Sequence, residues 1–293
     1  MPIVTPIVPP GEPRPGTRPD PSGYASSMVA PLSFALVLLL ALAWWGGPGW
    51  RPRAVPGVER RRPWALGHRG ARGPREENTA EAFELALSLV DGIETDVQRT
   101  ADGVLMLWHD FDVAGLEVRT ASLESLRERA PRLVTVQELF RIARDHPGTL
   151  LNLEIKSRPA WFRPWTLERD LVAAVRVSGL EDRVLVSSFD PLALARVRLS
   201  APRLRTALLT TPDAPRGLRS GRAARWLHVD ALHPEDRQVD APLLARCRRR
   251  GLPVHVWTVN DPTRIEELAR AGVGGVIGDD PSVLARHGKE PAA

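Results

Sequence analysis

The stretch from Leu66 to Asp110 reads Leu66-Gly-His-Arg-Gly, Glu77-Asn-Thr, Gly92-Ile-Glu-Thr-Asp, Asp102-Gly and Trp108-His-Asp, with short apolar runs between several of these groups. Residue types that can transfer protons or bind metal therefore recur at the ends of successive apolar segments. In a barrel of parallel strands, side chains from different strand ends meet at one mouth. The pattern predicts a barrel in which distant parts of the sequence share one pocket.

Short apolar runs and helix-period segments continue to alternate beyond this stretch. About eight strands alternating with helices over about 220 residues fit an α/β fold of the parallel TIM (βα)8 barrel type. A doubly wound open sheet is the alternative, because the closure of a sheet cannot be seen in sequence. Residues 110–134 are expected to form a polar excursion. The eight expected strands are Trp64–His68, Gly92–Val97, Thr149–Lys156, Arg183–Ser187, Thr206–Leu209, Leu227–Leu232, Pro253–Val259 and Gly274–Ile277, and Val104–Trp108 is a further extended segment. The expected helices are Thr79–Leu89, Thr135–Asp145, Thr166–Ser178, one from Pro191, Ala241–Arg250 and Pro262–Ala271.

The residues before this domain predict a tail and a membrane segment. Residues 1–27 are rich in proline and poor in large apolar residues, so we expect a disordered tail. Within 28–50, the run Val29–Trp45 is almost entirely apolar; as a helix it would span about 25 Å, close to the bilayer core of about 30 Å. We expect a single-pass membrane anchor near the N-terminus, with a cleaved signal peptide as the alternative.

The charge pattern on the two sides of the hydrophobic segment bears on its orientation. Arginines are more numerous after the segment than before it, which favours a cytoplasmic catalytic part by the positive-inside rule, but the side stays open. Met28 is an alternative start. Residues 51–63 are interpreted as a linker, 64–287 as the catalytic domain and 288–293 as a C-terminal tail.

Composition narrows the class of partner. The formal charge is +5 and the pI is near 10.4, yet the basic residues are scattered and no interleaved aromatic platform accompanies them. We therefore expect no nucleic-acid partner, but an arginine-rich surface that suits anionic lipid. Among the 40 basic residues only Lys156 and Lys289 are lysines. Cys247 stands alone, which excludes an intrachain disulfide and a thiolate zinc cluster.

Carboxylates at a spacing of two suggest a metal site. Glu94 and Asp96 lie two residues apart in a predicted strand, so both side chains project from the same face. Asn152, Glu154 and Lys156 repeat this device in the third predicted strand of the barrel, where the opposite face is apolar. Three oxygen ligands without cysteine suit a divalent ion such as Mg²⁺ or Ca²⁺ better than zinc, while ordinary pairing with arginines is the alternative.

Two histidines flank the predicted acidic cluster. His68 ends the first predicted strand beside Arg69, and His109 ends an extended segment beside Asp110. Imidazole changes charge near neutral pH, so this pair fits general acid and general base roles. His233 is intermediate, because it ends a strand before Pro234. The remaining histidines are interpreted as structural or exposed: His146, His228, His255 and His287.

The ordered series of motifs resembles that of the glycerophosphodiester phosphodiesterase family, within the superfamily of phospholipase C-like phosphodiesterase TIM barrels. It runs from about Ala65 to Pro281. The series departs from the family pattern at Glu76 and at Gly278, where the family has proline and threonine. The motifs are His68-Arg-Gly, Glu77-Asn-Thr, Ala82-Phe, Gly92-Ile-Glu-Thr-Asp-Val, Asp102-Gly, His109-Asp, Leu153-Glu-Ile-Lys, Ser188-Phe-Asp and Val256-Trp-Thr-Val-Asn.

The resemblance implies a metal-dependent hydrolase that splits glycerophosphodiesters into sn-glycerol 3-phosphate and an alcohol. One alternative is a lysophospholipase D-type enzyme acting on membrane lysolipids, which the anchor and an exposed loop with Trp161, Phe162 and Trp165 encourage. The other is a non-catalytic, membrane-tethered phosphoester-binding protein. Nothing in the sequence predicts the oligomeric state. The implied roles are metal binding by Glu94, Asp96 and Glu154, proton transfer by His68 and His109, phosphate contact by Arg69 and Lys156, and a wall on the glycerol side by Trp257.

Overall fold

The structure is a computed structural model, and it describes residues 50–53, 63–157 and 164–288. The chain divides into two units after Pro48, and every described residue belongs to the second. The predicted tail at 1–27, the apolar run of the membrane segment and the end of the chain from 289 lie outside the described residues. Among the described residues, no helix is both long and apolar enough to cross a bilayer.

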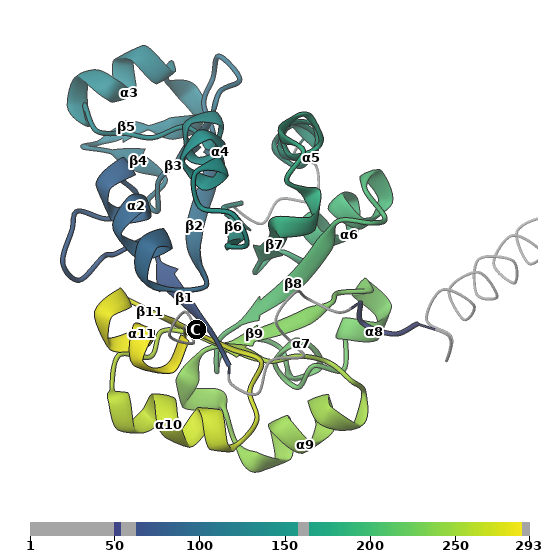
Figure 1. Ribbon diagram of the computed structural model, residues 1–293. Coiled ribbons are helices and arrows are strands. Elements are labelled where there is room, and N and C mark those ends of the chain that lie inside the picture. Colours follow the sequence, from purple (N-terminus) through teal and green to yellow (C-terminus); the bar gives the residue numbers. More distant parts are fainter. Residues whose placement is uncertain (1–49, 54–62, 158–163, 289–293) are drawn as a thin grey trace, which may run out of the picture. The chain divides into compact units, whose positions relative to one another are not determined.

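Eight parallel strands form the predicted barrel (Figure 1). Each is short and buried, and helices lie around the outside of the ring. The strands are β1 (Trp64–His68), β2 (Gly92–Arg99), β6 (Leu150–Ile155), β7 (Val184–Ser188), β8 (Arg205–Thr210), β9 (Ala231–Pro234), β10 (His255–Val256) and β11 (Gly275–Gly278).

The strand order excludes the doubly wound alternative. The order is β10-β11-β1-β2-β6-β7-β8-β9, so the strands follow the sequence around a ring in which the last strand pairs with the first. A doubly wound sheet would reverse its order at a switch point and leave two open edges. Here β9 and β10 are joined by two isolated bridges, Leu232 with Val254 and Glu235 with Trp257, so the ring is nearly closed.

Helices connect successive strands, and several begin with a side-chain cap. Thr135 and Glu138 form a reciprocal capping box at the start of α4, and the Asp190 side chain accepts from the Leu192 backbone at the start of α6. The helices are α2 (Ala80–Leu89), α3 (Leu123–Arg129), α4 (Val136–Arg144), α5 (Thr166–Ser178), α6 (Pro191–Ser200), α7 (Arg216–Arg219), α8 (Ala224–Leu227), α9 (Ala241–Arg249), α10 (Pro262–Arg270) and α11 (Pro281–Gly288), with 3-10 turns η1 (Val118–Thr120), η2 (Glu181–Arg183) and η3 (Asp236–Gln238).

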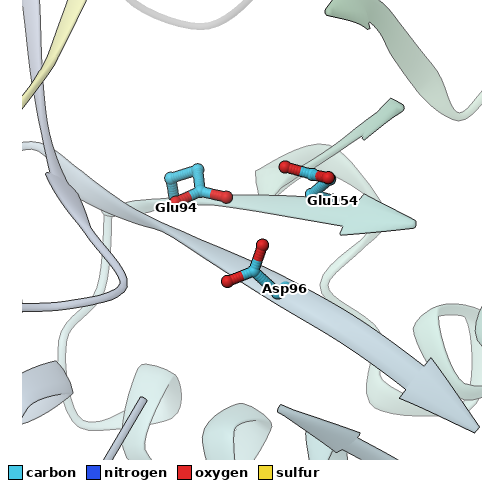
Figure 2. A group of neighbouring side chains, drawn as sticks. All are labelled: Glu94, Asp96 and Glu154. Atoms are coloured by element: carbon cyan, nitrogen blue, oxygen red, sulfur yellow. The ribbon is translucent and has the colours of Figure 1, made fainter. Parts of the chain in front are cut away.

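The register between β2 and β6 brings the predicted acidic residues together. Asp96 lies opposite Glu154, and Glu94 lies opposite Asn152 in the parallel ladder. Because alternate side chains share a face, Glu94, Asp96 and Glu154 project toward one another from the two adjacent strands (Figure 2). The pairing of these two strands therefore decides where a metal could bind.

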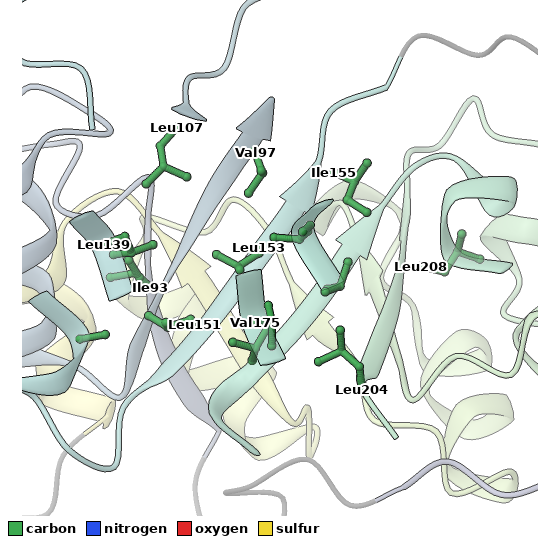
Figure 3. Packing of buried hydrophobic residues seen from close by; sticks show 14 of the residues in the cluster. Ile93, Val97, Leu107, Leu139, Leu151, Leu153, Ile155, Val175, Leu204 and Leu208 are labelled. Carbon is green, nitrogen blue, oxygen red and sulfur yellow. The ribbon is translucent and has the colours of Figure 1, made fainter. Parts of the chain in front are cut away.

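Two apolar clusters stabilise the ring from opposite sides. Outside it, alternate β6 residues such as Leu151 and Leu153 pack with helix residues such as Leu139 and Val175 (Figure 3). Burial of each such leucine contributes about 2 kcal/mol. A smaller cluster fills the inside of the barrel with side chains contributed by most of the strands. Its buried members are Trp64, Leu66, Leu150, Leu185, Ala207, Ala231 and Ile277.

The structure differs from the sequence prediction in three places. The strand expected at Leu227–Leu232 begins only at Ala231, because α8 occupies the preceding residues and ends at His228 in the left-handed region, with φ 51°. The excursion at 110–134 is more regular than expected. It contains a hairpin of β4 (Asp112–Val113) and β5 (Leu116–Glu117), followed by η1 and by α3, which Ser122 caps.

A third difference concerns the extended segment expected at Val104–Trp108. It forms β3 (Leu105–Leu107), which pairs antiparallel with β2 and lies off the barrel path. The antiparallel return follows from the tight turn at Asp102-Gly103, where Gly103 adopts φ 88°. This return carries the chain back along β2 from Arg99 to Val97, and the Trp108 backbone then donates to the Asp96 carbonyl at 3.0 Å, so His109 follows close to Asp96 in the fold.

Candidate active site

All eight residues predicted for the site line one cavity with a volume of about 150 Å³. They come from the carboxyl ends of β1, β2, β6 and β10 and from the segment after β3. Barrel enzymes place their sites at this end of the strands. The eight residues are His68, Arg69, Glu94, Asp96, His109, Glu154, Lys156 and Trp257.

The three carboxylates form a compact, buried cluster. One oxygen from each of Glu94, Asp96 and Glu154 lies within 4.8 Å of the others. Burial, together with the neighbouring Asp96 charge, raises the pKa of Glu154 to about 7 and holds the pKa of Glu94 well above its usual range. One oxygen of Asp96 is buried without a hydrogen-bond donor among the described residues. The cluster would be relieved by a cation between the carboxylates.

Two cations border this cluster. The Arg69 Nε atom lies 3.3 Å from Asp96, and the Lys156 Nζ atom lies 3.2 Å from Glu154 and 3.5 Å from Asp96. Burial lowers the pKa of both cations, but the neighbouring carboxylates outweigh it and the pKa of each is raised. Both side chains therefore remain charged at the edge of the cavity.

His68 is held by a network that the sequence did not predict. Its Nδ1 atom lies 2.7 Å from the Asp279 carboxylate, while its Nε2 atom faces Glu94 at 3.8 Å. The Asn260 amide donates to the other Asp279 oxygen at 2.7 Å, and it accepts from the Asp279 backbone at 2.8 Å. Although burial raises the pKa of Asp279, the contacts with His68 and Asn260 outweigh it and lower that pKa to about 2.

The sequence offered one signal for this network. Asp279 directly follows the last strand, and parallel strands end at the same rim as His68. In the motif series, the departure at the preceding residue, Gly278, drew attention away from Asp279. Glu77 belongs to the motif series, but the sequence predicted no role for it. Its carboxylate contacts Arg69 at 2.8 Å and Arg72 at 2.7 Å.

His109 lies in a more open environment than His68. Its Nδ1 atom is 2.7 Å from the adjacent Asp110 carboxylate, and its side chain is 37% exposed, against 12% for His68. Nearby, Gln98 donates to the Trp108 and Asp110 carbonyls and so ties the segment around His109 to β2. The two predicted acid–base residues thus border one cavity, with one rigidly oriented and the other nearer to solvent.

An apolar wall closes the cavity opposite the charged residues. Trp257 packs edge-on against Phe189 with 5.6 Å between ring centroids, and the Trp257 indole donates to the His233 carbonyl at 2.8 Å. Leu209 and Ile277 complete this wall. Sequence reasoning assigned a role to Trp257 alone, because apolar residues at strand ends look the same as core residues.

Two further histidines lie inside the barrel and outside the catalytic cavity. The His233 and His255 rings are 4.8 Å apart and fully buried, and no ring nitrogen has a partner among the described residues. Burial lowers the pKa of His255 to about 4, and burial with the neighbouring imidazole lowers the pKa of His233 well below its usual value. Both rings are therefore neutral at pH 7. For His255, predicted to be structural or exposed, full burial excludes the exposed alternative.

Comparison with known proteins identifies the family of this chain. The model of the glycerophosphoryl diester phosphodiesterase family matches residues 68–283. A glycerophosphodiester phosphodiesterase of Caldanaerobacter subterraneus is 32% identical over 75% of this chain and 95% of its own length. An enzyme of the same name from Bacillus altitudinis is 30% identical over 73% of this chain and 93% of its own.

Solved structures show the same architecture. The glycerophosphodiester phosphodiesterase of Thermotoga maritima superposes with a TM-score of 0.63 at 25% identity, covering 76% of this chain and 97% of that one. An Oleispira antarctica phosphodiesterase, solved in complex with its product sn-glycerol-3-phosphate, superposes with a TM-score of 0.65 over 78% of this chain and 98% of that one. At 21% identity, the second likeness concerns the fold alone.

Proposed function

This chain belongs to the glycerophosphoryl diester phosphodiesterase family and is a phosphoric diester hydrolase; from that premise we propose that it releases sn-glycerol 3-phosphate and an alcohol from glycerophosphodiesters, using a divalent metal ion and two histidines. The observation that carries the proposal is the single cavity of about 150 Å³ in which carboxylates, cations and both histidines meet. The relatives named above support the substrate class.

The chemistry of the donor set fits a hard divalent ion, Mg²⁺ or Ca²⁺. Glu94, Asp96 and Glu154 would hold it, since oxygen donors without thiolates or a close histidine pair are what such ions prefer. When bound, the ion would supply Lewis-acid stabilisation of negative charge on the phosphoryl oxygens. Because protons compete with the ion for Glu154 and Glu94, whose pKa values are raised, the affinity for metal is expected to fall below about pH 7.

Arg69 and Lys156 would orient the phosphodiester. Three carboxylates with one divalent cation leave a net charge of about −1, which would repel a substrate that itself carries one negative charge. The guanidinium and ammonium groups add two positive charges at the edge of the same cavity and reverse that repulsion. They also face the site where charge develops on phosphorus.

The two histidines would transfer the protons. One accepts a proton from the attacking nucleophile, which is either water or the neighbouring glycerol hydroxyl, and the other donates a proton to the departing alkoxide, so the alcohol leaves neutral. Attack by the glycerol hydroxyl would give a cyclic phosphate that water then opens. The hydrogen bond that the His68 Nδ1–H donates to the Asp279 carboxylate would hold the ring in the orientation that this exchange requires. His109, with its more exposed ring, has room to exchange a proton with a group near the mouth of the cavity.

The size of the cavity favours glycerol over a lysolipid on the Trp257 side. A volume of about 150 Å³ suits a glycerol phosphate group and leaves little room for an acyl chain within this cavity, although a neighbouring cavity of about 440 Å³ shares Lys156 and includes Phe111 and Leu167 in its lining. The exposed Trp165 is the one described residue of the aromatic loop that motivated the lysophospholipase D-type alternative. The non-catalytic alternative would require the loss of an acid–base or ligand position, and all of these residues are present.

Release of sn-glycerol 3-phosphate from a panel of glycerophosphodiesters tests the proposal. We expect turnover of glycerophosphocholine that EDTA abolishes and that Mg²⁺ or Ca²⁺ restores. Lysophosphatidylcholine serves as the competing substrate. Faster turnover of the lysolipid would establish the alternative enzyme, whereas binding of either compound without metal-dependent turnover would establish the non-catalytic protein.

The histidine roles have their own test. His68→Ala and His109→Ala should each lower turnover by about 10² or more, because a positioned acid or base contributes about that factor. The circular dichroism spectrum should stay unchanged. His146→Ala, a substitution outside the cavity, is the matched control. Near-wild-type rates in either of the first two variants would overturn the assignment.

The membrane anchor remains a separate proposal. The near-continuous apolar run within 28–50 supports a single-pass anchor that tethers the enzyme near its lipid-derived substrates, on a side not assigned. Retention of the full chain in carbonate-washed membranes, compared with a chain starting at residue 51, would test it. Equal partition of both forms into the supernatant would contradict the anchor.

A further inference from the structure

A second cavity, outside the proposed catalytic site, is lined by arginines. It has a volume of about 380 Å³ and lies among α7, the loop after it, η3 and α9. The catalytic cavity shares none of its lining residues. Its five cationic side chains are Arg216, Arg219, Arg222, Arg237 and Arg246.

Among the described residues, most of these arginines lack the carboxylate partner that buried arginines have elsewhere in the protein. Arg53 and Arg198 both contact Asp230, whose carboxylate lies 2.6 and 2.7 Å from them. In the second cavity, only Arg237 has a carboxylate partner, Glu235. The other four arginines form no ion pair within residues 50–53, 63–157 and 164–288.

The lining contains a single acidic side chain, and it is already engaged. Asp240 caps α9 by accepting from the Leu243 backbone at 2.6 Å. Even with Asp240, Glu235 and the nearby Asp213 counted against the five arginines, two positive charges remain around one concave surface. Like charges that line one concave surface repel one another, and an anion between them reduces that repulsion.

Backbone contacts hold two of the guanidinium groups in place. Arg219 donates to the Pro212 carbonyl at 2.9 Å, and Arg246 donates to the Ser220 carbonyl at 3.5 Å. In the loop after α7, Gly221 adopts φ 69°, a left-handed conformation that glycine accepts without strain. Each contact occupies one N–H group, and a guanidinium has five, so both side chains keep donors for a ligand.

The second cavity lies at the rim of the same barrel end as the catalytic site. Its residues follow β8 and β9 directly, and Gln238 ties η3 to the end of β8 by donating to the Thr210 carbonyl at 2.9 Å and to its hydroxyl at 2.6 Å. Leu209, which precedes Thr210, lines the catalytic cavity. A ligand bound by the arginines would therefore sit beside the mouth, behind its apolar wall.

We propose that this cavity is a phosphate-binding site distinct from the catalytic one. Guanidinium groups donate two parallel hydrogen bonds to phosphate oxygens, and converging arginines are a recurring way to hold a phosphate ester. The phosphate belongs either to a soluble compound or to the headgroup of an anionic phospholipid. The site goes beyond the proposed hydrolysis, because it contains no acid–base residue and needs no metal ion.

Titration of the full chain with inorganic phosphate in the presence of EDTA, followed by calorimetry, tests the site. Arg216→Ala/Arg222→Ala should weaken phosphate binding by at least about tenfold, because each lost bidentate contact is worth about that factor. Arg169→Ala/Arg270→Ala removes two exposed arginines from α5 and α10 and should change the affinity less than twofold. Both double variants should hydrolyse glycerophosphocholine at wild-type rates.

Two further variants keep the result interpretable. Lys156→Ala should leave this binding in place, which separates it from phosphate held in the catalytic cavity. Arg222→Gln alone should weaken binding in the same direction if the double variant fails to fold. The proposal is overturned if Arg216→Ala/Arg222→Ala binds phosphate as tightly as its control does and also floats with anionic vesicles to the same extent as the wild type.

Vesicle flotation identifies the source of the phosphate. Vesicles of phosphatidylglycerol and phosphatidylcholine are compared with vesicles of phosphatidylcholine alone, which controls for insertion of the N-terminal segment. Extra retention on the anionic vesicles that disappears in Arg216→Ala/Arg222→Ala assigns the site to a lipid headgroup, even without binding of free phosphate. Binding of free phosphate without extra retention assigns a soluble ligand, and neither effect means that no phosphate site exists.

Discussion

The barrel buries polar side chains in two regions: those at the mouth are charged, and those inside the barrel are neutral. At the mouth, Glu94, Asp96 and Glu154 are buried beside Arg69 and Lys156, so negative and positive charges are buried together. Inside the barrel, the His233 and His255 rings lie side by side without any hydrogen-bond partner among the described residues. Their lowered pKa values keep them uncharged at neutral pH.

The difference shows what burial of a charge requires. A lone ionised group in an apolar interior is so costly that it becomes neutral, which is the state of the histidine pair. Opposite charges a few ångströms away offset part of the desolvation free energy of a buried charge. The mouth can therefore keep carboxylates that exchange a proton for a metal ion. Charge therefore persists in the barrel at the place where the proposed chemistry uses it.

The largest expected effect concerns a carboxylate of the mouth. Glu154→Gln should lower turnover about 10³-fold, because the metal contributes several kcal/mol of transition-state stabilisation. The melting temperature should stay the same or rise, since the substitution removes a buried charge. Steady-state kinetics and thermal unfolding measure the two effects, with the exposed Glu267→Gln as the control. Loss of the fold instead of activity would show that the cluster is structural.

The histidine pair should make stability depend on pH. The unfolded chain binds a proton at His255 below a pKa of about 6.5, whereas the folded chain binds it only below about 4. The unfolded state therefore holds more protons between these values, and lowering the pH from 7 to 4 should cost up to about 3 kcal/mol of unfolding free energy through this group.

Urea unfolding at pH 4 to 7 measures this dependence. His255→Leu should flatten the fall in stability toward acid, because the neutral side chain takes up no proton on unfolding. His146→Gln, which lies outside the barrel interior, should leave the slope as in the wild type. An unchanged slope in the His255 variant would mean that its ring titrates alike in both states.

A smaller effect is expected at the residue that orients His68. Asp279→Asn keeps the size of the side chain but weakens its hydrogen bond to the Nδ1 atom, so kcat should fall about 10- to 100-fold, as for other partners that orient a functional histidine. KM should stay within about twofold, which separates positioning from substrate binding. Asp280→Asn is the neighbouring control. A rise in KM at constant kcat would contradict the positioning role.

The smallest effect concerns Asn152, which lies two residues before Glu154 on the same face of β6. Its amide is fully buried with neither polar atom hydrogen-bonded among the described residues. Asn152→Leu should therefore stabilise the fold by about 1 kcal/mol, because an unpaired buried amide is replaced by an apolar group of similar shape. Chemical unfolding checks this. A clear loss of stability would show that the amide has a partner, such as an ordered water.

Much of the site could be predicted from residue spacing. The period of two in β2 and β6 placed Glu94 with Asp96, and Glu154 with Lys156, on shared faces. Spacing could not reveal that Asp96 lies opposite Glu154, because register depends on how two strands pair. It also misplaced the start of β9, where a short helix ending in a left-handed His228 overrides the apolar pattern.

The sequence by itself determined that strands and helices alternate, that polar residues end several strands, and that the motif series is that of a phosphodiesterase family. These properties depend on local periodicity and on residue types, which are written along the chain. Only the tertiary structure decided that the ring nearly closes and that Asp279, 211 positions from His68, orients its ring. Such contacts depend on the closure of the barrel, since closure brings the last strand beside the first.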